Sequence, residues 1–137
     1  MRYAHITGWG KYLPPTVLTN HDLAEIVDTS DEWIVEHTGI RERRIAAVGD
    51  TTASMATAAA QQALERAGLA ATDLELIIVS TSSPDRQLPG AAPIVQSMLG
   101  AEQAPAFDLR SGCSGFVFGL SVARQYILSG SYRRVLV

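Results

Sequence analysis

The chain has 137 residues, of which 47% are hydrophobic and 18% are charged, and its formal net charge is -3. This size and apolar content fit one globular domain rather than a disordered segment. The weak negative charge argues against a nucleic-acid-binding surface. Neither a membrane-spanning apolar run nor a signal peptide is recognisable. Because the chain has one cysteine, it cannot form an internal disulfide, and we expect a soluble, cytoplasmic protein.

The first quarter of the chain predicts a strand and a short helix. Apolar and polar residues roughly alternate over residues 2–9, which predicts a first strand. The run Leu13-Pro14-Pro15 then interrupts regular structure. Asn20 is expected to cap a helix that reaches Val27, because its side chain can accept a backbone N–H of the first turn.

Two further helices are predicted before the middle of the chain. The first begins at Thr29 or Ser30 and has Gly39 beyond its end. The second is rich in alanine, covers residues 51–67 and is closed by Gly68. Both have polar N-caps and a glycine after the last turn, which is the usual asymmetry of helix ends.

The second half alternates between strands and helices. The predicted strands are residues 76–81, 105–109 and 134–137, and the predicted helices between them are residues 94–99 and 114–129. This alternation predicts an α/β fold with a largely parallel sheet. The helix at 114–129 is apolar on nearly all sides, so we expect it to be buried. Because the last strand begins where the sequence stops, we expect residues 1–137 to be part of a larger fold.

The strongest chemical signal surrounds Cys113, in the segment FDLRSGCSGF at residues 107–116. A strand runs into a tight turn there, and an apolar helix follows immediately. Gly112 and Gly115 permit a sharp turn and close approach by a substrate. The positive end of the helix favours thiolate over thiol, and the Cys113 backbone N–H is placed to meet a developing oxyanion. This context favours a nucleophile over an ordinary buried cysteine.

Other residues have simpler interpretations. No metal site is predicted, since one cysteine and three scattered histidines lack ligand spacing. Ser111 and Ser114 are weaker nucleophile candidates, because no G-x-S-x-G pattern is present. Taken alone, Trp33 is better explained as a packing residue than as a binding residue. The remaining polar candidates are interpreted as solvated or structural: Arg41, Arg43, Arg44, His5 and His21.

Several spaced motifs resemble the β-ketoacyl-acyl carrier protein synthase III family. These are TSDEWIV at 29–35, TGIRER at 38–43, SMLG at 97–100 and the Cys113 segment, in the same order as in that family. The resemblance covers essentially the whole chain. It implies the thiolase-like fold, in which two similar halves stack into αβαβα layers. Residues 1–137 would then be the amino-terminal half-domain, cut within a strand, and the carboxy-terminal half would lie outside this sequence. It also implies a homodimer.

The resemblance assigns roles to five residues. Cys113 matches the nucleophile that takes an acyl group from acyl-CoA. Trp33 matches the aromatic residue that stacks on the CoA adenine, and Thr29 matches a polar contact at that end. His37 falls where the family usually has an arginine near the CoA phosphates. Leu88 falls on the loop that closes the acyl pocket of the partner across the dimer.

The implied reaction is a decarboxylative Claisen condensation of an acyl-CoA primer with malonyl-acyl carrier protein in fatty acid biosynthesis. The CoA thioester is a substrate, and no separate cofactor is expected. The second stage uses a histidine and an asparagine of the other half in this family, so we expect residues 1–137 alone to be inactive. Two alternatives stay open. One is a related acyltransferase or a condensing enzyme of secondary metabolism, and the other is a non-catalytic half-domain.

Overall fold

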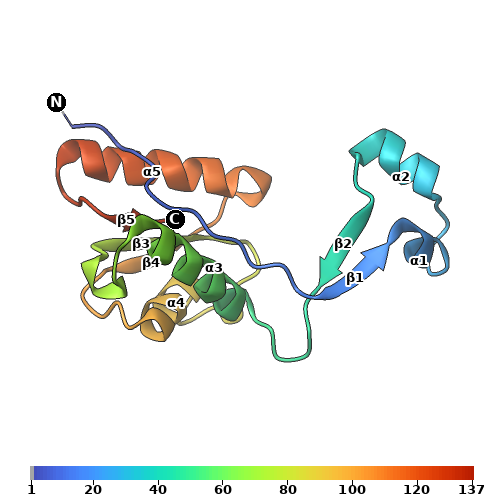
Figure 1. Ribbon diagram of the computed structural model, residues 1–137, viewed down its shortest axis with the longest axis horizontal. Helices are drawn as coiled ribbons and strands as arrows, with labels where there is room; N and C mark the ends of the chain where they lie inside the picture. The colour runs from blue at the N-terminus through green and yellow to red at the C-terminus, as the bar shows by residue number, and fades with distance from the viewer. Residues whose placement is uncertain (1) are drawn as a thin grey trace. The chain divides into compact units, whose positions relative to one another are not determined.

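The computed structural model describes residues 2–137 and divides them into two compact units. The larger unit comprises the start of the chain through Tyr12 together with Thr51–Val137, and the smaller unit is Leu13–Asp50 (Figure 1). Each unit has its own sheet. Among the residues that the structure describes, no helix is both long and apolar enough to cross a bilayer.

The larger unit is built on a parallel sheet of three strands. The central strand, β3 (Leu76–Ser80), pairs on one side with β4 (Ala106–Leu109) and on the other with β5 (Val135–Leu136). Leu76, Ile77 and Ile78 are each at most 2% exposed. A strand that is apolar on both faces is typical of a parallel sheet covered on both sides. The three strands predicted in the second half of the chain and their parallel arrangement are confirmed.

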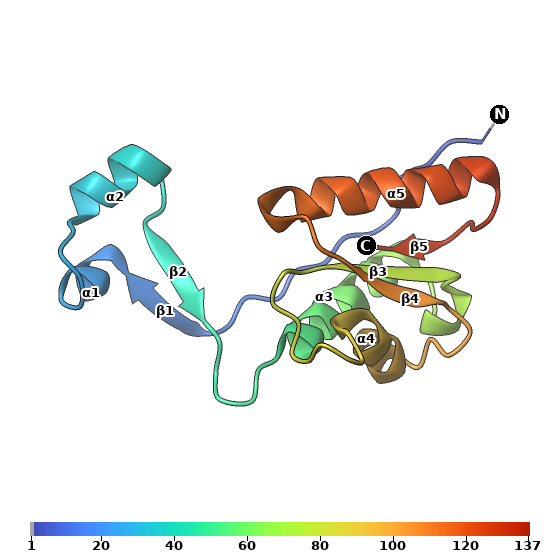
Figure 2. The same cartoon turned by 180° about the vertical axis from the view of Figure 1, so that it is seen from behind.

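Helices cover both faces of this sheet. The helices α3 (Thr52–Ala67) and α4 (Ala91–Leu99) lie on one face, and α5 (Gly115–Ser129) lies on the other (Figures 1 and 2). The strand order β4-β3-β5 explains this division. The connection from β3 to β4 and the return from β4 to β5 run in opposite directions across the sheet. Right-handed crossovers therefore place their helices on opposite faces.

Two apolar clusters hold the three layers together. Ile77 belongs to the cluster between the sheet and α3 and α4, where it meets Leu64 and Val95. Ile78 belongs to the cluster on the other face, with Ala123 of α5. Neighbouring residues of a strand point to opposite faces, so alternate residues of β3 contribute to the two clusters.

The ends of the helices follow local sequence signals. Thr51 caps α3 through a reciprocal pair of bonds with Ser54, and Gly68 ends the helix with φ of 65°. Gly100 ends α4 in the same left-handed conformation, with φ of 72°. A single turn of 3-10 helix at Ala71–Asp73 leads into β3. The boundaries predicted for α3, α4 and β3 are confirmed within one to three residues.

The amino-terminal segment is not a strand, so the strand predicted over residues 2–9 is wrong. The segment instead packs on α3, and its glycines permit the contact. A Cβ atom on Gly10 would lie 1.9 Å from the Ala59 carbonyl oxygen. Trp9 covers the same helix from outside, with the Arg66 guanidinium 4.0 Å from its ring centroid. The alternating pattern predicted backbone pairing, but in this structure the segment contacts a helix.

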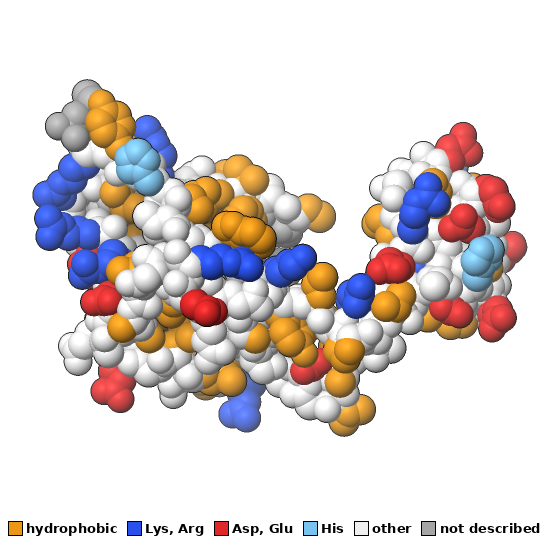
Figure 3. All heavy atoms as spheres, in the orientation of Figure 1, with side chains coloured by type: hydrophobic (Ala, Val, Ile, Leu, Met, Phe, Trp, Pro, Cys, Tyr) orange, Lys and Arg blue, Asp and Glu red, His pale blue; other side chains and the backbone are white. Residues whose placement is uncertain are grey.

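The helix α5 is only partly buried among residues 2–137. Its covered face consists of Gly115, Gly119 and Ala123. Hydrophobic side chains lie at the surface over this helix (Figure 3), including Phe116 at 60%, Val117 at 64% and Phe118 at 53% exposed. The sequence predicted that this helix is buried on nearly all sides, but among residues 2–137 these side chains stay exposed. Apolar composition predicts that a helix can be buried, but the sheet covers only one face of it.

The smaller unit combines a hairpin-like pair of strands with two short helices. β1 (Thr16–Thr19) pairs antiparallel with β2 (Glu42–Ile45). Between them lie α1 (Asn20–Ala24) and α2 (Asp31–Thr38). The helix predicted to begin at Thr29 or Ser30 is confirmed as α2. The Ser30 hydroxyl accepts the Trp33 N–H at 3.2 Å, and Gly39 ends the helix with φ of 71°.

Asn20 has a different role from the predicted one. Thr19 caps α1 through a reciprocal pair of bonds with Asp22, so Asn20 is the first helical residue rather than the cap. The Asn20 side chain is buried and bonds across the unit. Its amide donates to Asp31 at 2.7 Å and to the Ile40 carbonyl at 2.8 Å, and its oxygen accepts from Arg43 at 2.7 Å.

We therefore predict that Asn20→Ala destabilises the smaller unit. Removing a buried amide with three partners should cost about 1–3 kcal/mol, since the partners lose bonds that water replaces only in part. Denaturant unfolding followed by the fluorescence of Trp33, in a Trp9→Phe background, measures the change. Thr16→Ala on the exposed start of β1 is the control. Equal midpoints for Asn20→Ala and Thr16→Ala would contradict this role.

Candidate active site

The topology of the larger unit brings two loops to one edge of the sheet. The strands β3 and β4 are parallel neighbours, so the loops after them begin at the same edge. The chain then turns to opposite faces, toward α4 after β3 and toward α5 after β4 (Figure 2). In open α/β sheets, ligands bind at such a switch point, outside the carboxyl ends of the strands. Leu88 lies on the first of these loops and Cys113 on the second.

Cys113 lies in a one-turn 3-10 helix, Gly112–Ser114, directly before α5. Gly112 has φ of 52°, a left-handed conformation that favours glycine. The Ser114 hydroxyl donates to the Ser111 carbonyl at 3.1 Å and braces the turn. The thiol is free and exposed. The predicted strand, turn and helix are confirmed, and they present Cys113 at the positive end of α5.

A close contact between α5 and β3 holds this turn in place. The Ser80 hydroxyl, at the end of β3, donates to the Gly115 carbonyl at 3.0 Å. A Cβ atom on Gly115 would lie 3.3 Å from the Ser80 Cβ, and one on Gly119 would lie 2.8 Å from the Ser80 oxygen. The first turn of α5 thus lies against the end of the central strand. No local sequence signal marks Ser80, because only the pairing of distant segments reveals its partner.

The loop that carries Leu88 is anchored at its start. The Asp85 carboxylate accepts the Thr52 N–H at 2.7 Å and the Ala53 N–H at 2.9 Å, at the amino end of α3. Gln87 accepts a bond from Arg110 of the second loop at 3.3 Å. Leu88 itself is 89% exposed. The loop is therefore held in place while Leu88 projects from it.

Asp108 of β4 anchors the other end of the same loop. Its carboxylate accepts the Ala91 N–H at 2.9 Å and the Ala92 N–H at 2.6 Å, at the amino end of α4. A Cβ atom on Gly90 would lie 2.5 Å from this carboxylate, so glycine permits the approach. Asp108 thereby links the strand that leads to Cys113 with the loop that carries Leu88. In the sequence, the signal for this role is a carboxylate within an otherwise apolar strand.

The predicted CoA-contacting residues lie in the smaller unit. Trp33 is 55% exposed on α2, and His37 stacks on it one turn later. The ring centroids are 4.3 Å apart at an interplanar angle of 21°. The His37 Nδ1 atom lies 2.7 Å from the Trp33 carbonyl oxygen. Thr29 is half-buried just before the Ser30 cap, at the start of the same helix.

Hydrogen bonds at the amino end of α2 favour negative charge there. The backbone N–H of Glu32 and the Ser30 hydroxyl hold the pKa of the Glu32 carboxyl below its usual value. On α1, bonds from the hydroxyl and N–H of Thr19 lower the pKa of Asp22. Both carboxylates are therefore ionised at neutral pH.

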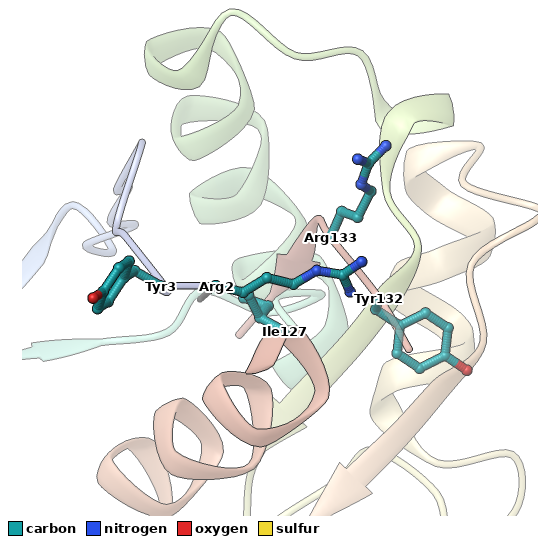
Figure 4. Close-up of a pocket in the computed structure, with 5 residues that line it drawn as sticks. All are labelled: Arg2, Tyr3, Ile127, Tyr132 and Arg133. Carbon is teal, nitrogen blue, oxygen red and sulfur yellow. The ribbon is translucent and has the colours of Figure 1, made fainter. Parts of the chain in front are cut away.

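A hollow of about 250 Å³ lies elsewhere in the larger unit. Its lining residues are Arg2, Tyr3, Ile127, Tyr132 and Arg133, and Figure 4 shows Arg2 and Tyr3 projecting in opposite directions. Ile127 belongs to the last turns of α5, at the opposite end of the helix from Cys113. This hollow is therefore separate from the candidate site. Among residues 2–137, no three His, Cys, Asp or Glu side chains are grouped so that they could hold a metal ion.

Comparison with known proteins agrees with this geometry. Residues 107–137 match the family model described as 3-oxoacyl-[acyl-carrier-protein] synthase III. The chain is 56% identical to the β-ketoacyl-[acyl-carrier-protein] synthase III of Methylococcus capsulatus over 136 residues, which is 99% of this chain and 42% of that relative. The chain is related along its whole length to β-ketoacyl-acyl carrier protein synthase III.

Solved structures of β-ketoacyl-acyl carrier protein synthase III relatives share the fold. The synthase III of Aquifex aeolicus superposes with a TM-score of 0.91 at 49% identity, covering 95% of this chain and 42% of that one. The priming β-ketosynthase of the R1128 polyketide pathway gives 0.92 at 36% identity, covering 96% and 40%. The thiolase-like α/β fold is thus confirmed.

The chain spans about two-fifths of the length of the synthase III relatives that it matches. That these residues are the first of two similar halves stays a prediction. The roles of Thr29, Trp33, His37, Leu88 and Cys113 also stay predictions.

We predict that Asp108→Ala loosens the loop that carries Leu88. Two amide groups at the amino end of α4 would lose a charged acceptor, which should cost about 1–3 kcal/mol of stability. Asp108→Asn should cost less, since an amide oxygen still accepts one bond. Denaturant unfolding gives the cost, and hydrogen exchange at Ala91 and Ala92 reports the local loss. Unchanged exchange at both amides in Asp108→Ala would exclude this anchoring role.

Proposed function

We propose that this chain supplies the acyl-accepting part of an enzyme that condenses an acyl-CoA primer with malonyl-acyl carrier protein in fatty acid biosynthesis. The main support is the exposed Cys113 thiol, in a tight turn at the positive end of α5 and at the switch point of the sheet. The relationship to β-ketoacyl-acyl carrier protein synthase III along the whole chain supports the same reaction.

The first stage is a transfer of the acyl group to sulfur. The Cys113 thiolate attacks the thioester carbonyl, a new carbon–sulfur bond forms, and CoA leaves as its thiolate. In this proposal, the Cys113 backbone N–H stabilises the oxyanion of the tetrahedral intermediate. In the second stage, malonyl-acyl carrier protein loses CO₂ and the resulting carbanion attacks the acyl-cysteine. The β-ketoacyl product forms, and the Cys113 thiolate is released.

The remaining roles belong to the same proposal. Trp33 stacks on the CoA adenine, with Thr29 and His37 as polar contacts, and no cofactor is needed beyond the CoA thioester substrate. A homodimer is proposed, in which Leu88 closes the acyl pocket of the partner. Its high exposure on an anchored loop is consistent with contact to a second chain. A cytoplasmic location is proposed because acyl-CoA and acyl carrier protein are intracellular substrates.

A second candidate is the priming condensation of a polyketide pathway. The solved priming β-ketosynthase superposes with a TM-score of 0.92. The higher identity to the Methylococcus capsulatus synthase III, 56% against 36%, favours fatty acid biosynthesis. The two functions differ in the primer accepted, so the acyl-chain profile of the protein distinguishes them.

We predict that Cys113→Ala abolishes acyl-enzyme formation in the complete gene product that contains this chain. Intact mass after incubation with a pantetheine thioester should show one acyl adduct in the unaltered protein and none in the variant, whereas Ser114→Ala should keep the adduct. An adduct that survives in Cys113→Ala would refute the proposed nucleophile.

We predict that Trp33→Ala weakens acyl-CoA binding by about 1–3 kcal/mol, the scale of base–aromatic stacking. Transfer from a pantetheine thioester, which lacks adenine, should change little. Steady-state kinetics with both donors measures the difference, and Trp9→Ala is the matched tryptophan control. Equal losses with both donors would mean that Trp33 acts through folding.

We predict that Leu88 sets the acyl-chain preference. Leu88→Trp should favour shorter acyl-CoA primers, and Leu88→Ala should accept longer ones, because each buried methylene contributes about 0.8 kcal/mol. Competition among primers of increasing length gives the profile, and Arg86→Ala on the same loop is the control. A profile that neither Leu88 substitution alters would place this residue outside the pocket.

A further inference from the structure

The turn that carries Cys113 is fixed to the sheet at both of its ends by one residue, Ser80. On the strand side, Ser80 of β3 is the register partner of Leu109, the last residue of β4. On the helix side, the Ser80 hydroxyl donates to the Gly115 carbonyl at 3.0 Å. Residues 110–114, here called the Cys113 turn, lie between these two contacts. Both ends of the turn are therefore held at one point of the sheet.

Two glycines of α5 leave room for the Ser80 side chain. Gly115 and Gly119 are buried and lie one turn apart on the same face of the helix. A Cβ atom on Gly119 would lie 2.8 Å from the Ser80 hydroxyl oxygen. Ser80 therefore lies against two successive turns of α5, and the bond to the Gly115 carbonyl selects one position of the helix along the strand.

Within the part of the chain that the structure describes, two other side-chain hydrogen bonds involve the Cys113 turn, and neither ties it to the sheet. The Ser114 hydroxyl bonds to the Ser111 carbonyl inside the turn. The Arg110 guanidinium reaches Gln87 of the neighbouring loop at 3.3 Å through a long, exposed side chain. Arginine loses more rotamer freedom on ordering than most side chains, so this second bond constrains the turn weakly. The half-buried Ser80 has the shorter side chain and the shorter bond.

We propose that Ser80 is a positioning residue for the nucleophile, and that its hydroxyl sets the rate at which Cys113 takes up the acyl group. This inference rests on the proposed function, in which the Cys113 sulfur attacks a thioester. Such an attack needs the reacting atoms about 3–3.5 Å apart and correctly aligned, so a displaced nucleophile reacts more slowly. In this role Ser80 takes no part in bond formation and acts through the position of the Cys113 turn.

Two pairs of variants separate the hydroxyl from the shape of the side chain. Ser80→Ala removes the donor and adds no atom against α5. Ser80→Thr and Ser80→Val are both β-branched, and they differ by the hydroxyl alone. Any crowding of the helix is common to that pair, so its two rates again compare a donor with no donor. Thr57→Val is the control, because it removes a buried hydroxyl that donates to the Ala53 carbonyl at 2.8 Å within α3.

The test measures single-turnover acylation of the complete gene product by an acyl-CoA, followed by intact mass. The maximal rate should be about fivefold lower in Ser80→Ala than in the unaltered protein, the scale of one neutral hydrogen bond. Ser80→Val should be slower than Ser80→Thr by the same factor. The acyl-CoA concentration that gives half of the maximal rate should not change, because Ser80 is not among the proposed CoA contacts. Thr57→Val should lower stability without slowing acylation.

Equal maximal rates within both pairs would overturn the proposal. An effect confined to the half-saturating concentration, or equal slowing by Thr57→Val, would overturn it as well, since either result would mean that Ser80 acts through binding or through general stability.

Hydrogen exchange reports the position of the turn without any reaction. Amides in the first turn of α5 should exchange about fivefold faster in Ser80→Ala than in the unaltered protein. If the unaltered protein is acylated and the rates within each pair are equal, the Ser80 inference fails alone. If the unaltered protein is not acylated, the proposed reaction fails, and exchange then decides the role of Ser80: faster exchange supports it, and unchanged exchange overturns it.

Discussion

The close contact of α5 with the central strand determines the geometry of the candidate site. Gly115, Gly119 and Ala123 give this helix a face with almost no side-chain bulk, so that it lies directly on β3. The Ser80 hydroxyl bonds to the Gly115 carbonyl and fixes the first turn of the helix. Cys113 precedes that turn by two residues, so its position depends on this contact. A Cβ atom at Gly115 would lie 3.3 Å from the Ser80 Cβ, so a larger residue there would crowd this contact.

The same crossover topology places the loop that carries Leu88 beside the turn that carries Cys113. Each end of the Leu88 loop is held in the same way, by a carboxylate that accepts N–H groups at the amino end of a helix. Asp85 does this at α3 and Asp108 does it at α4. Because Asp108 also belongs to the strand that leads to Cys113, the nucleophile and the loop of Leu88 share one support. Changes in one loop are therefore expected to reach the other through β4.

The candidate binding residues of the smaller unit depend on a different and more local constraint. Trp33 and His37 are four residues apart on α2, a spacing that places side chains on one face of a helix. Their stacking and the bond from His37 to the Trp33 carbonyl need only that helix. The buried Asn20 then ties α1, α2 and β2 together around it. The smaller unit thus supports the helix α2, and this helix alone defines the geometry of the Trp33–His37 pair.

The sequence determined the features that depend on neighbouring residues. The capped helices, the glycines that end them, the apolar strands and the turn at Cys113 follow from local hydrogen bonding and from the alternation of strand and helix signals. Tertiary structure decided the features that need a distant partner. Residues 2–9 pack on a helix instead of pairing as a strand, and Asn20 bonds across its unit instead of capping. Within the part of the chain that the structure describes, α5 is covered on one face. Ser80 and Asp108 also gain their roles from residues 16 or more positions away. Side-chain periodicity shows that a surface can be covered, but the partner that covers it is chosen only when the whole chain packs.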